Sequence, residues 1–233
     1  MNNKKFLIAL LLFAGSSLLS NAQKETDPRL HAEGDKGWGM YQASDTTKSK
    51  RVLLIGDSIL GGYLAEVLKA LKDEVAIDYW ITPINEGSPE LFSSLQRVMS
   101  HGPYDIIHFN IGLHGWPKGR VDDTKYEAIM QQYIDILKKG SPNADLIWAT
   151  TTPVTVKGDS SKLNEEINPI IVSRNKMALV VMKKNHVEID DLYGLMVNNL
   201  PMARGDMFHW TPEGVHLQGE AVIEIIKKSL SRK

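Results

Sequence analysis

The segment Arg51-Val-Leu-Leu-Ile-Gly-Asp-Ser-Ile-Leu60 decides the fold class of this chain. Its uninterrupted apolar run, Val52 to Ile55, predicts a parallel strand that is covered on both faces. Gly56 ends the run, and apolar residues at helical spacing start at Leu60 and continue to Leu71. The segment therefore predicts a strand, a sharp turn and a helix, with Ser58 in the turn.

Ser58 has two interpretations at this point. A serine between a strand and a helix is a common N-cap, and the tripeptide alone favours that role. The same position also lies at the carboxyl end of a strand, where open α/β sheets bind their ligands, and at a helix N-terminus, which favours negative charge. The rest of the chain must decide between the two.

Beyond residue 60, apolar segments of strand length and helix length alternate. This alternation predicts a parallel sheet with helices on both faces, a three-layer α/β/α fold. Five strands are expected, at 51–55, 74–81, 104–112, 145–150 and 187–192. Helices are expected between them and after the last strand, and residues 153–163 are expected to form a loop.

The first 49 residues are expected to stand apart from this domain. Residues 1–22 resemble a secretory signal, because Lys4 and Lys5 precede an apolar stretch that ends in Ser20-Asn-Ala22. Residues 23–49 are polar and rich in glycine, which predicts a linker and an arm over the domain surface. The folded domain is then 50–233, the protein is exported to the periplasm or the medium, and no stable membrane insertion follows removal of the signal.

Composition excludes several classes of function. The 233 residues contain no cysteine, which excludes disulfides, thiolate catalysis and cysteine-ligated metal. The formal net charge is −1, and the basic residues are scattered, so no nucleic-acid partner is expected. Asp190-Asp191 is an acidic pair, but no third ligand has a suitable spacing, so neither a metal nor another cofactor is predicted.

A serine hydroxyl needs a neighbouring base to act as a nucleophile. Of the seven histidines, His209 is the best candidate, in Gly205-Asp-Met-Phe-His-Trp-Thr-Pro-Glu-Gly214. Asp206 is three residues earlier and can orient the ring, while Thr211 and Pro212 predict a helix start directly after it. The alternative is a surface histidine near a cap. His216 lies inside the last helix and is expected to be at the surface or the edge of the core.

The two segments together resemble the first and last signature blocks of the SGNH hydrolases, also called GDSL esterases. The resemblance covers about residues 50–230. Gly87 in Asn85-Glu-Gly-Ser88 fits the glycine of the second block. The third block usually reads Gly-x-Asn-Asp, but here it is Gly112-Leu-His-Gly115, and the preceding run resembles a subgroup with an HFNxGLH version of the block.

The resemblance implies a flavodoxin-like sheet and a role for each residue. Ser58 is the nucleophile, His209 the base and Asp206 its orienting carboxylate, with no cofactor. The oxyanion hole would combine the backbone N–H groups of Ser58 and Gly87 with one side chain. Asn110 and His114 are both candidates for that side chain, and the sequence does not choose between them.

The expected function is that of an exported serine esterase that cleaves O-acetyl or similar esters from carbohydrates or small molecules. Trp38, Trp116 and Trp210 are equally compatible with a sugar-binding wall and with the core. A thioesterase or a peptidoglycan-active esterase is compatible with the same residues. The alternative from another class is a catalytically weak or inactive glycan-binding protein, which the altered third block suggests. A nucleotide-binding protein is disfavoured, because no glycine-rich phosphate loop follows the first strand.

Overall fold

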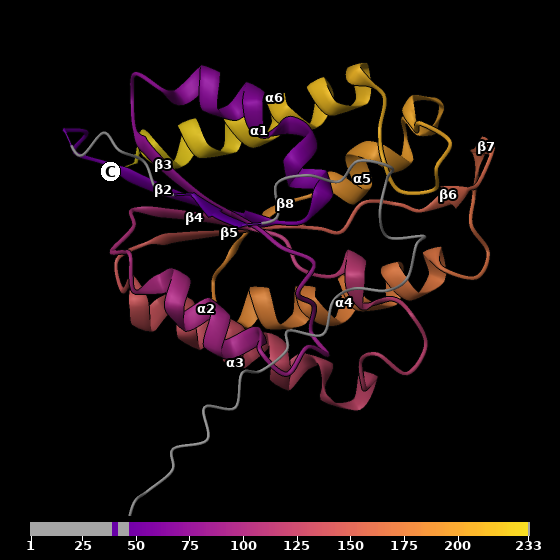
Figure 1. Cartoon of the computed structure of the whole chain (residues 1–233), viewed down its shortest axis with the longest axis horizontal. Coiled ribbons are helices and arrows are strands. Elements are labelled where there is room, and N and C mark those ends of the chain that lie inside the picture. Colours follow the sequence, from indigo (N-terminus) through magenta and orange to yellow (C-terminus); the bar gives the residue numbers. More distant parts are fainter. Residues whose placement is uncertain (1–38, 42–46, 233) are drawn as a thin grey trace, which may run out of the picture.

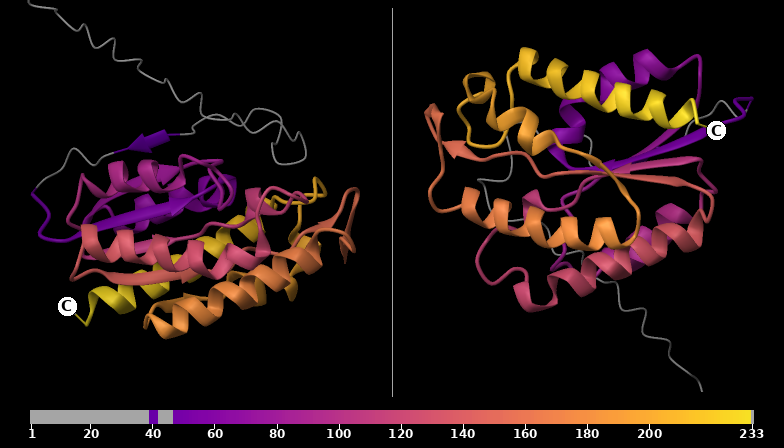
Figure 2. Two further views of the ribbon diagram at one scale, coloured as in Figure 1. Left: turned by 90° about the horizontal axis from the view of Figure 1, so that it is seen from below. Right: turned by 180° about the vertical axis from the view of Figure 1, so that it is seen from behind.

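The computed structural model describes residues 39–41 and 47–232, which form three layers with a sheet in the middle (Figure 1). The view from behind in Figure 2 shows the same layers. The signal segment 1–22 and most of the arm 23–49 lie outside the described residues. Within the described ranges, none of the helices has the length and apolar character needed to span a bilayer.

The central sheet has six strands in the order β1-β3-β2-β4-β5-β8. All pairs are parallel except β1 with β3, which is antiparallel. The five parallel strands have the flavodoxin-like order, in which the first strand of the series lies between the second and the third. The strand bounds are β1 Gly39–Tyr41, β2 Arg51–Gly56, β3 Ala76–Ile81, β4 Ile106–Phe109, β5 Asp145–Ala149 and β8 Glu188–Asp190.

Helices cover both faces of the sheet. The upper layer in Figure 1 contains α1 (Ser58–Leu71), the short α5 (Leu192–Val197) and α6 (Pro212–Leu230). The lower layer contains α2 (Leu91–Met99), α3 (Tyr126–Gly140) and α4 (Asn168–Lys184). This arrangement confirms the predicted three-layer α/β fold with its mostly parallel sheet.

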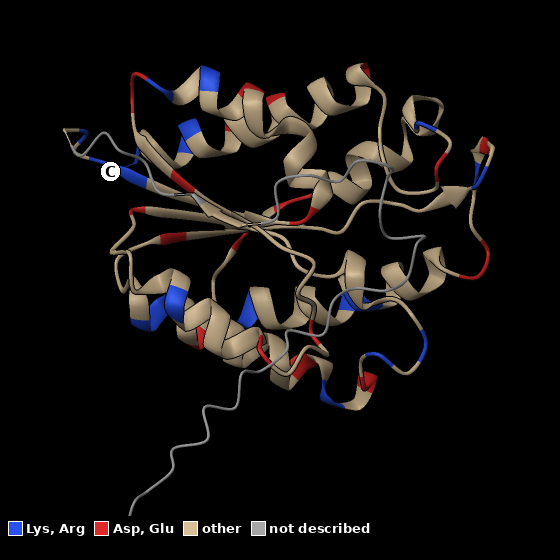
Figure 3. Ribbon diagram, viewed as in Figure 1, with Lys and Arg blue, Asp and Glu red and all other residues tan. Residues whose placement is uncertain are grey.

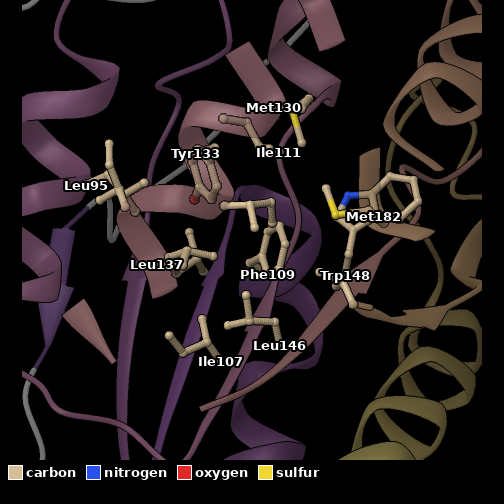
Figure 4. Close-up of a cluster of buried hydrophobic side chains, with 14 of the residues drawn as sticks. Leu95, Ile107, Phe109, Ile111, Met130, Tyr133, Leu137, Leu146, Trp148 and Met182 are labelled. Atoms are coloured by element: carbon tan, nitrogen blue, oxygen red, sulfur yellow. The ribbon is translucent and has the colours of Figure 1, made fainter. Parts of the chain in front are cut away.

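Burial explains why the strands form where the sequence is most apolar. Val52, Leu53 and Leu54 of β2 are 0% exposed, because helices cover alternate side chains on both faces. On the lower face, side chains of β4 and β5 meet those of α2, α3 and α4, as Figure 4 shows for Phe109, Tyr133 and Leu137. Phe109 and Tyr133 stack with ring centroids 5.6 Å apart. This dense packing fixes the carboxyl ends of the strands, from which the site loops leave.

The structure contains strands that the sequence analysis did not predict. Gly39–Tyr41 of the expected arm forms the edge strand β1, so the sheet has six strands instead of five. The expected loop at 153–163 contains an antiparallel hairpin, formed by β6 (Thr155–Val156) and β7 (Asp159–Leu163). Neither segment has a recognisable apolar pattern in the sequence. β1 is only 3 residues long, which is too short to show one, and β7 has no fully buried residue, so its sequence needs no apolar run.

Ile107 lies in the middle of β4 and is 0% exposed, so its replacement tests the core directly. Ile107→Ala should lower the free energy of unfolding by about 2–5 kcal/mol, because it leaves a cavity that close-packed neighbours cannot fill. Val180 is 57% exposed, and Val180→Ala should change stability by less than about 0.5 kcal/mol. Urea unfolding of both variants measures the difference, and equal effects would contradict the described core.

Candidate active site

Ser58 is the first residue of α1, at the carboxyl end of β2. Asp57, not Ser58, is the N-cap: its side chain accepts the backbone N–H of Ile59 at 2.9 Å. Asp57 is 5% exposed, so it fixes the turn between strand and helix from inside the protein. The Ser58 hydroxyl is therefore not needed for capping.

The hydroxyl of Ser58 lies next to the ring of His209. The distance between His209 Nε2 and Ser58 Oγ is 2.9 Å, across 151 positions of sequence. On the other side of the ring, His209 Nδ1 is 3.0 Å from Asp206 Oδ2. The carboxylate requires the proton on Nδ1, which leaves Nε2 free to accept the serine proton. Ser58, His209 and Asp206 thus form a continuous relay of hydrogen-bonded side chains.

The loop before α6 holds Asp206 rigidly. Its Oδ1 accepts the backbone N–H groups of Phe208 at 3.1 Å and His209 at 2.8 Å, and its Oδ2 accepts Arg204 Nε at 2.9 Å. Met207, between Asp206 and Phe208, has φ 91°, an uncommon value for a residue with a side chain. Its carbonyl accepts the backbone N–H of Thr155 at 3.0 Å, so the hairpin that follows β5 supports the strained turn.

The hydrogen bonds also determine the charge of Asp206. Partial burial alone would raise its pKa, but the bonds from the His209 ring and backbone, with a smaller effect of Arg204, lower the pKa well below its usual value. Asp206 is therefore ionised at any pH at which a histidine can act as a base. A fixed negative charge next to Nδ1 stabilises the imidazolium that forms when Nε2 takes a proton.

The end of the loop is fixed by the start of the last helix, as the sequence predicted. Thr211 is the N-cap of α6, and its side chain accepts the backbone N–H of Gly214. Pro212 is the first helical residue. His216 lies one turn further and pairs with Glu66 at the surface, with 3.0 Å between His216 Nδ1 and Glu66 Oε2, and it has no part in the relay.

Asn110 lies at the end of β4, beside Ser58's helix. Its Nδ2 donates to Ala149 O at 2.7 Å and is 3.4 Å from Thr151 Oγ1. Asn110 borders two small hollows, each of about 10 Å³. One of them is lined by Ile59, Tyr63, Leu113 and Leu192, along with threonines 150–152. Asn110 is therefore a half-buried donor with one N–H held by a carbonyl and the other weakly engaged.

The other two proposed oxyanion donors have different surroundings. His114 is 2% exposed and lies in the 3-10 helix Leu113–Gly115, and its backbone carbonyl accepts Arg120 Nη1 at 2.8 Å. Gly87 is exposed, and its N–H donates to Asn85 Oδ1 at 3.0 Å, within its own loop. A Cβ atom at Gly87 would lie 1.9 Å from Arg120 O, so a close backbone approach requires glycine there.

The remaining candidates from the sequence, where the structure describes them, take part in an ion pair, a helix cap or the core. Asp190 pairs with His108, with 2.9 Å between carboxylate and ring nitrogen, and Asp191 caps α5. Among residues 39–41 and 47–232, no three His, Asp or Glu side chains are arranged to hold a metal ion. Trp116 and Trp210 are 2% and 5% exposed and belong to the core, and Trp38 lies outside the described residues. Basic and acidic residues are interspersed over the molecule (Figure 3).

Comparison of whole structures finds the same fold in known proteins. A lipase/acylhydrolase from Enterococcus faecalis aligns with 77% of this chain and 96% of its own, at TM-score 0.63 and 18% identity. An acetyl xylan esterase aligns over 76% of this chain and 99% of its own length, with a TM-score of 0.63 and 21% sequence identity. A carbohydrate esterase family 3 protein from Talaromyces cellulolyticus aligns over 78% of this chain and 99% of its own length, with a TM-score of 0.63 and 13% sequence identity. The chain shares their fold.

The similarity to these proteins is recognised through structure alone. No protein-family model matches the chain, and no curated protein matches it by sequence. The alignment covers nearly the full length of each of these esterases, so this chain contains the complete fold.

Three features of the site were not recognised in the sequence. Arg204 could have been suspected as a cation two residues before Asp206, but nothing marked the left-handed backbone of Met207. Glu86 stands inside the second block, between Asn85 and Gly87, and it is 4% exposed. Tyr126 Oη donates to Glu86 Oε1 at 2.9 Å. A buried carboxylate at a site loop is a candidate functional group, and only the structure reveals that Glu86 is buried.

Burial raises the pKa of the Glu86 carboxyl above its usual value, and its own backbone N–H, Arg174 and Tyr126 oppose the shift only in part. A raised pKa in the folded state gives stability that is complete below the unfolded pKa of about 4.3 and is lost as pH rises through the folded pKa. The free energy of unfolding of the wild type should therefore fall over this pH window relative to that of Glu86→Gln. Denaturant unfolding at a series of pH values measures both curves, and parallel curves would contradict the shift.

Proposed function

We propose that the chain is a serine esterase of the SGNH type, which hydrolyses carboxylic esters through an acyl-enzyme intermediate. The observation that carries the proposal is the relay from Ser58 Oγ through His209 to Asp206, with 2.9 Å and 3.0 Å between successive atoms. A hydroxyl held against an oriented imidazole is an activated nucleophile. The esterases that share this fold are consistent with the assignment.

In the first half of the reaction, Ser58 Oγ attacks the ester carbonyl carbon and His209 Nε2 takes the hydroxyl proton. The tetrahedral intermediate collapses when the bond to the alcohol oxygen breaks, and His209 gives its proton to the leaving alcohol. In the second half, water attacks the acyl-enzyme and His209 takes a proton from it. The carboxylic acid leaves, and the proton returns to Ser58 Oγ. Asp206 stays ionised throughout and stabilises each imidazolium.

The side-chain donor to the oxyanion is assigned to Asn110. It is half-buried at the carboxyl end of β4, it borders both hollows, and one of its N–H groups is only weakly engaged. His114 borders only one of the hollows and is 2% exposed. The N–H of Ser58 is the second donor. Gly87 can contribute its N–H only after release from Asn85 Oδ1.

A short acyl group fits the space beside Asn110. A hollow of about 10 Å³ has room for one water-sized group. Ile59, Leu113 and Leu192 supply apolar lining, with threonines 150–152 beside them, and this surface suits a methyl group. We therefore assign acetyl or similarly short esters, with a carbohydrate or another small polyol as the alcohol. The segment 1–22 is proposed to export the protein, and no nucleic acid or membrane partner is assigned.

The direct test is hydrolysis of nitrophenyl acetate by the purified protein. Ser58→Ala and His209→Ala should each lower kcat at least about 10⁴-fold, because the relay acts as a unit. His216→Ala is the matched control and should keep wild-type turnover, since its ring faces Glu66 at the surface. Turnover that survives Ser58→Ala would refute the mechanism. Negligible turnover by the wild type would favour the glycan-binding alternative.

A second comparison separates the two candidate donors. Asn110→Ala should lower kcat by about 100- to 1000-fold with little change in KM, because the lost bond is made to the oxyanion. His114→Ala should act chiefly on melting temperature, since the ring is enclosed and 2% exposed. The reverse pattern, with kcat lost only in His114→Ala, would assign the donor to His114.

A further inference from the structure

Glu86 has no role in the reaction described above, yet its carboxylate is buried among the loops that form the site. It belongs to the loop after β3, residues 82–88. Its neighbours come from three other elements: the loop after β4, residues 110–115, called here the β4 loop, and the helices α3 and α4. A buried carboxylate is costly, and such groups are kept where they are hydrogen-bonded or paired. Glu86 therefore needs an explanation.

The two oxygens of Glu86 have different surroundings. Oε1 accepts the hydroxyl of Tyr126 at 2.9 Å. Oε2 is buried, and within the described part of the chain it has no hydrogen-bond partner. Arg174 Nη1 is likewise buried and unbonded there, while its Nε and Nη2 both donate to Asp123 Oδ1 at 3.1 Å. A carboxylate oxygen and a guanidinium N–H group thus face the same interior space.

Gly115 of the β4 loop borders this space. A Cβ atom there would lie 2.4 Å from Glu86 Oε2 and 3.1 Å from Arg174 Nη1. Gly115 ends the 3-10 helix Leu113–Gly115, whose backbone residues other than glycine also adopt. The Glu86 carboxylate, with Arg174 beside it, therefore occupies the space that a side chain at position 115 would take, and the backbone conformation itself does not require glycine.

Gly112 connects the same carboxylate to the donor side chain. A Cβ atom at Gly112 would lie 2.4 Å from Thr151 Oγ1 and 3.5 Å from Glu86 Oε1. Thr151 Oγ1 is in turn 3.4 Å from Asn110 Nδ2. The side chains of Thr151 and Glu86 thus both lie against Gly112, two residues after the proposed oxyanion donor.

We propose that Glu86 is a positioning residue, whose buried carboxylate holds the β4 loop in the conformation that aims Asn110 at the oxyanion and fills the place of a side chain at position 115. The inference rests on the proposed esterase function. It gives the departure at Gly115, where the third block usually carries aspartate, a physical reason: the carboxylate comes from position 86 instead.

The proposal requires that the carboxylate can be moved from one loop to the other. Glu86→Ala should lower kcat for nitrophenyl acetate by about 10- to 100-fold with little change in KM, because a loop shift of about 1 Å misplaces the donor. Gly115→Asp alone should also lower kcat, since its Cβ meets Glu86 Oε2. The double variant should regain most of the loss, because the new carboxylate fills the vacated space and faces Arg174.

Glu90→Gln is the matched control, because Glu90 lies just beyond the same loop and its side chain makes no capping hydrogen bond. It should keep wild-type kcat. If Glu86→Ala does not fold, the pair Glu86→Asp and Gly115→Ala makes the same test, since one methylene is moved from position 86 to position 115. Gly115→Ala should damage the wild type and improve the Glu86→Asp variant.

The Asn110→Ala variant, used as the starting protein, distinguishes a positioning role of Glu86 from an effect on general stability. In Asn110→Ala, the oxyanion donor is already absent, so adding Glu86→Ala should lower kcat less than threefold more. Full additivity of the two losses would overturn the positioning role. If Gly115→Asp lowers kcat equally in the wild type and in Glu86→Ala, the side chains at positions 86 and 115 do not share one space. Absence of wild-type turnover would refute the esterase function and the positioning role together, while melting temperatures would still report the shared space.

Discussion

The contact between Ser58 Oγ and His209 Nε2 is the constraint on which the site depends. It joins the start of α1 to the loop before α6, 151 positions apart. A parallel sheet makes this contact feasible, because the carboxyl ends of its strands lie along one edge. The packed cores on both faces then hold that edge still. A hydroxyl–imidazole distance of 2.9 Å is thus a property of the whole domain and not of either loop alone.

Within that edge, backbone hydrogen bonds hold the loop that carries Asp206 and His209. Asp206 accepts two amides of its own loop, and the loop's strained residue, Met207, is held by Thr155 of the hairpin. The α6 helix fixes the other end through Thr211 and Pro212. Strain at Met207 is acceptable because several independent bonds determine the same conformation.

The sequence predicts those parts of this structure that depend on local pattern. The five parallel strands appear as apolar or alternating segments of strand length, and the pairing of Asp206 with His209 follows from three-residue spacing next to a helix start. The edge strand β1 and the hairpin are not predictable in this way, because both are short and neither carries a buried apolar run. The surroundings of Glu86 are also hidden, since its partners Tyr126 and Arg174 come from distant helices. Likewise, composition could not place Trp116 and Trp210 in the core.

The two edge strands have a consequence for the protein in concentrated solution. The outermost strands of the sheet, β1 and β8, are each only 3 residues long. An exposed sheet edge can pair with another molecule through its free backbone groups, and the tendency grows with the length of the strand. Such short borders offer a neighbouring molecule only a few hydrogen bonds. The short edge strands thus limit pairing between the sheets of neighbouring molecules, whatever the surface charge.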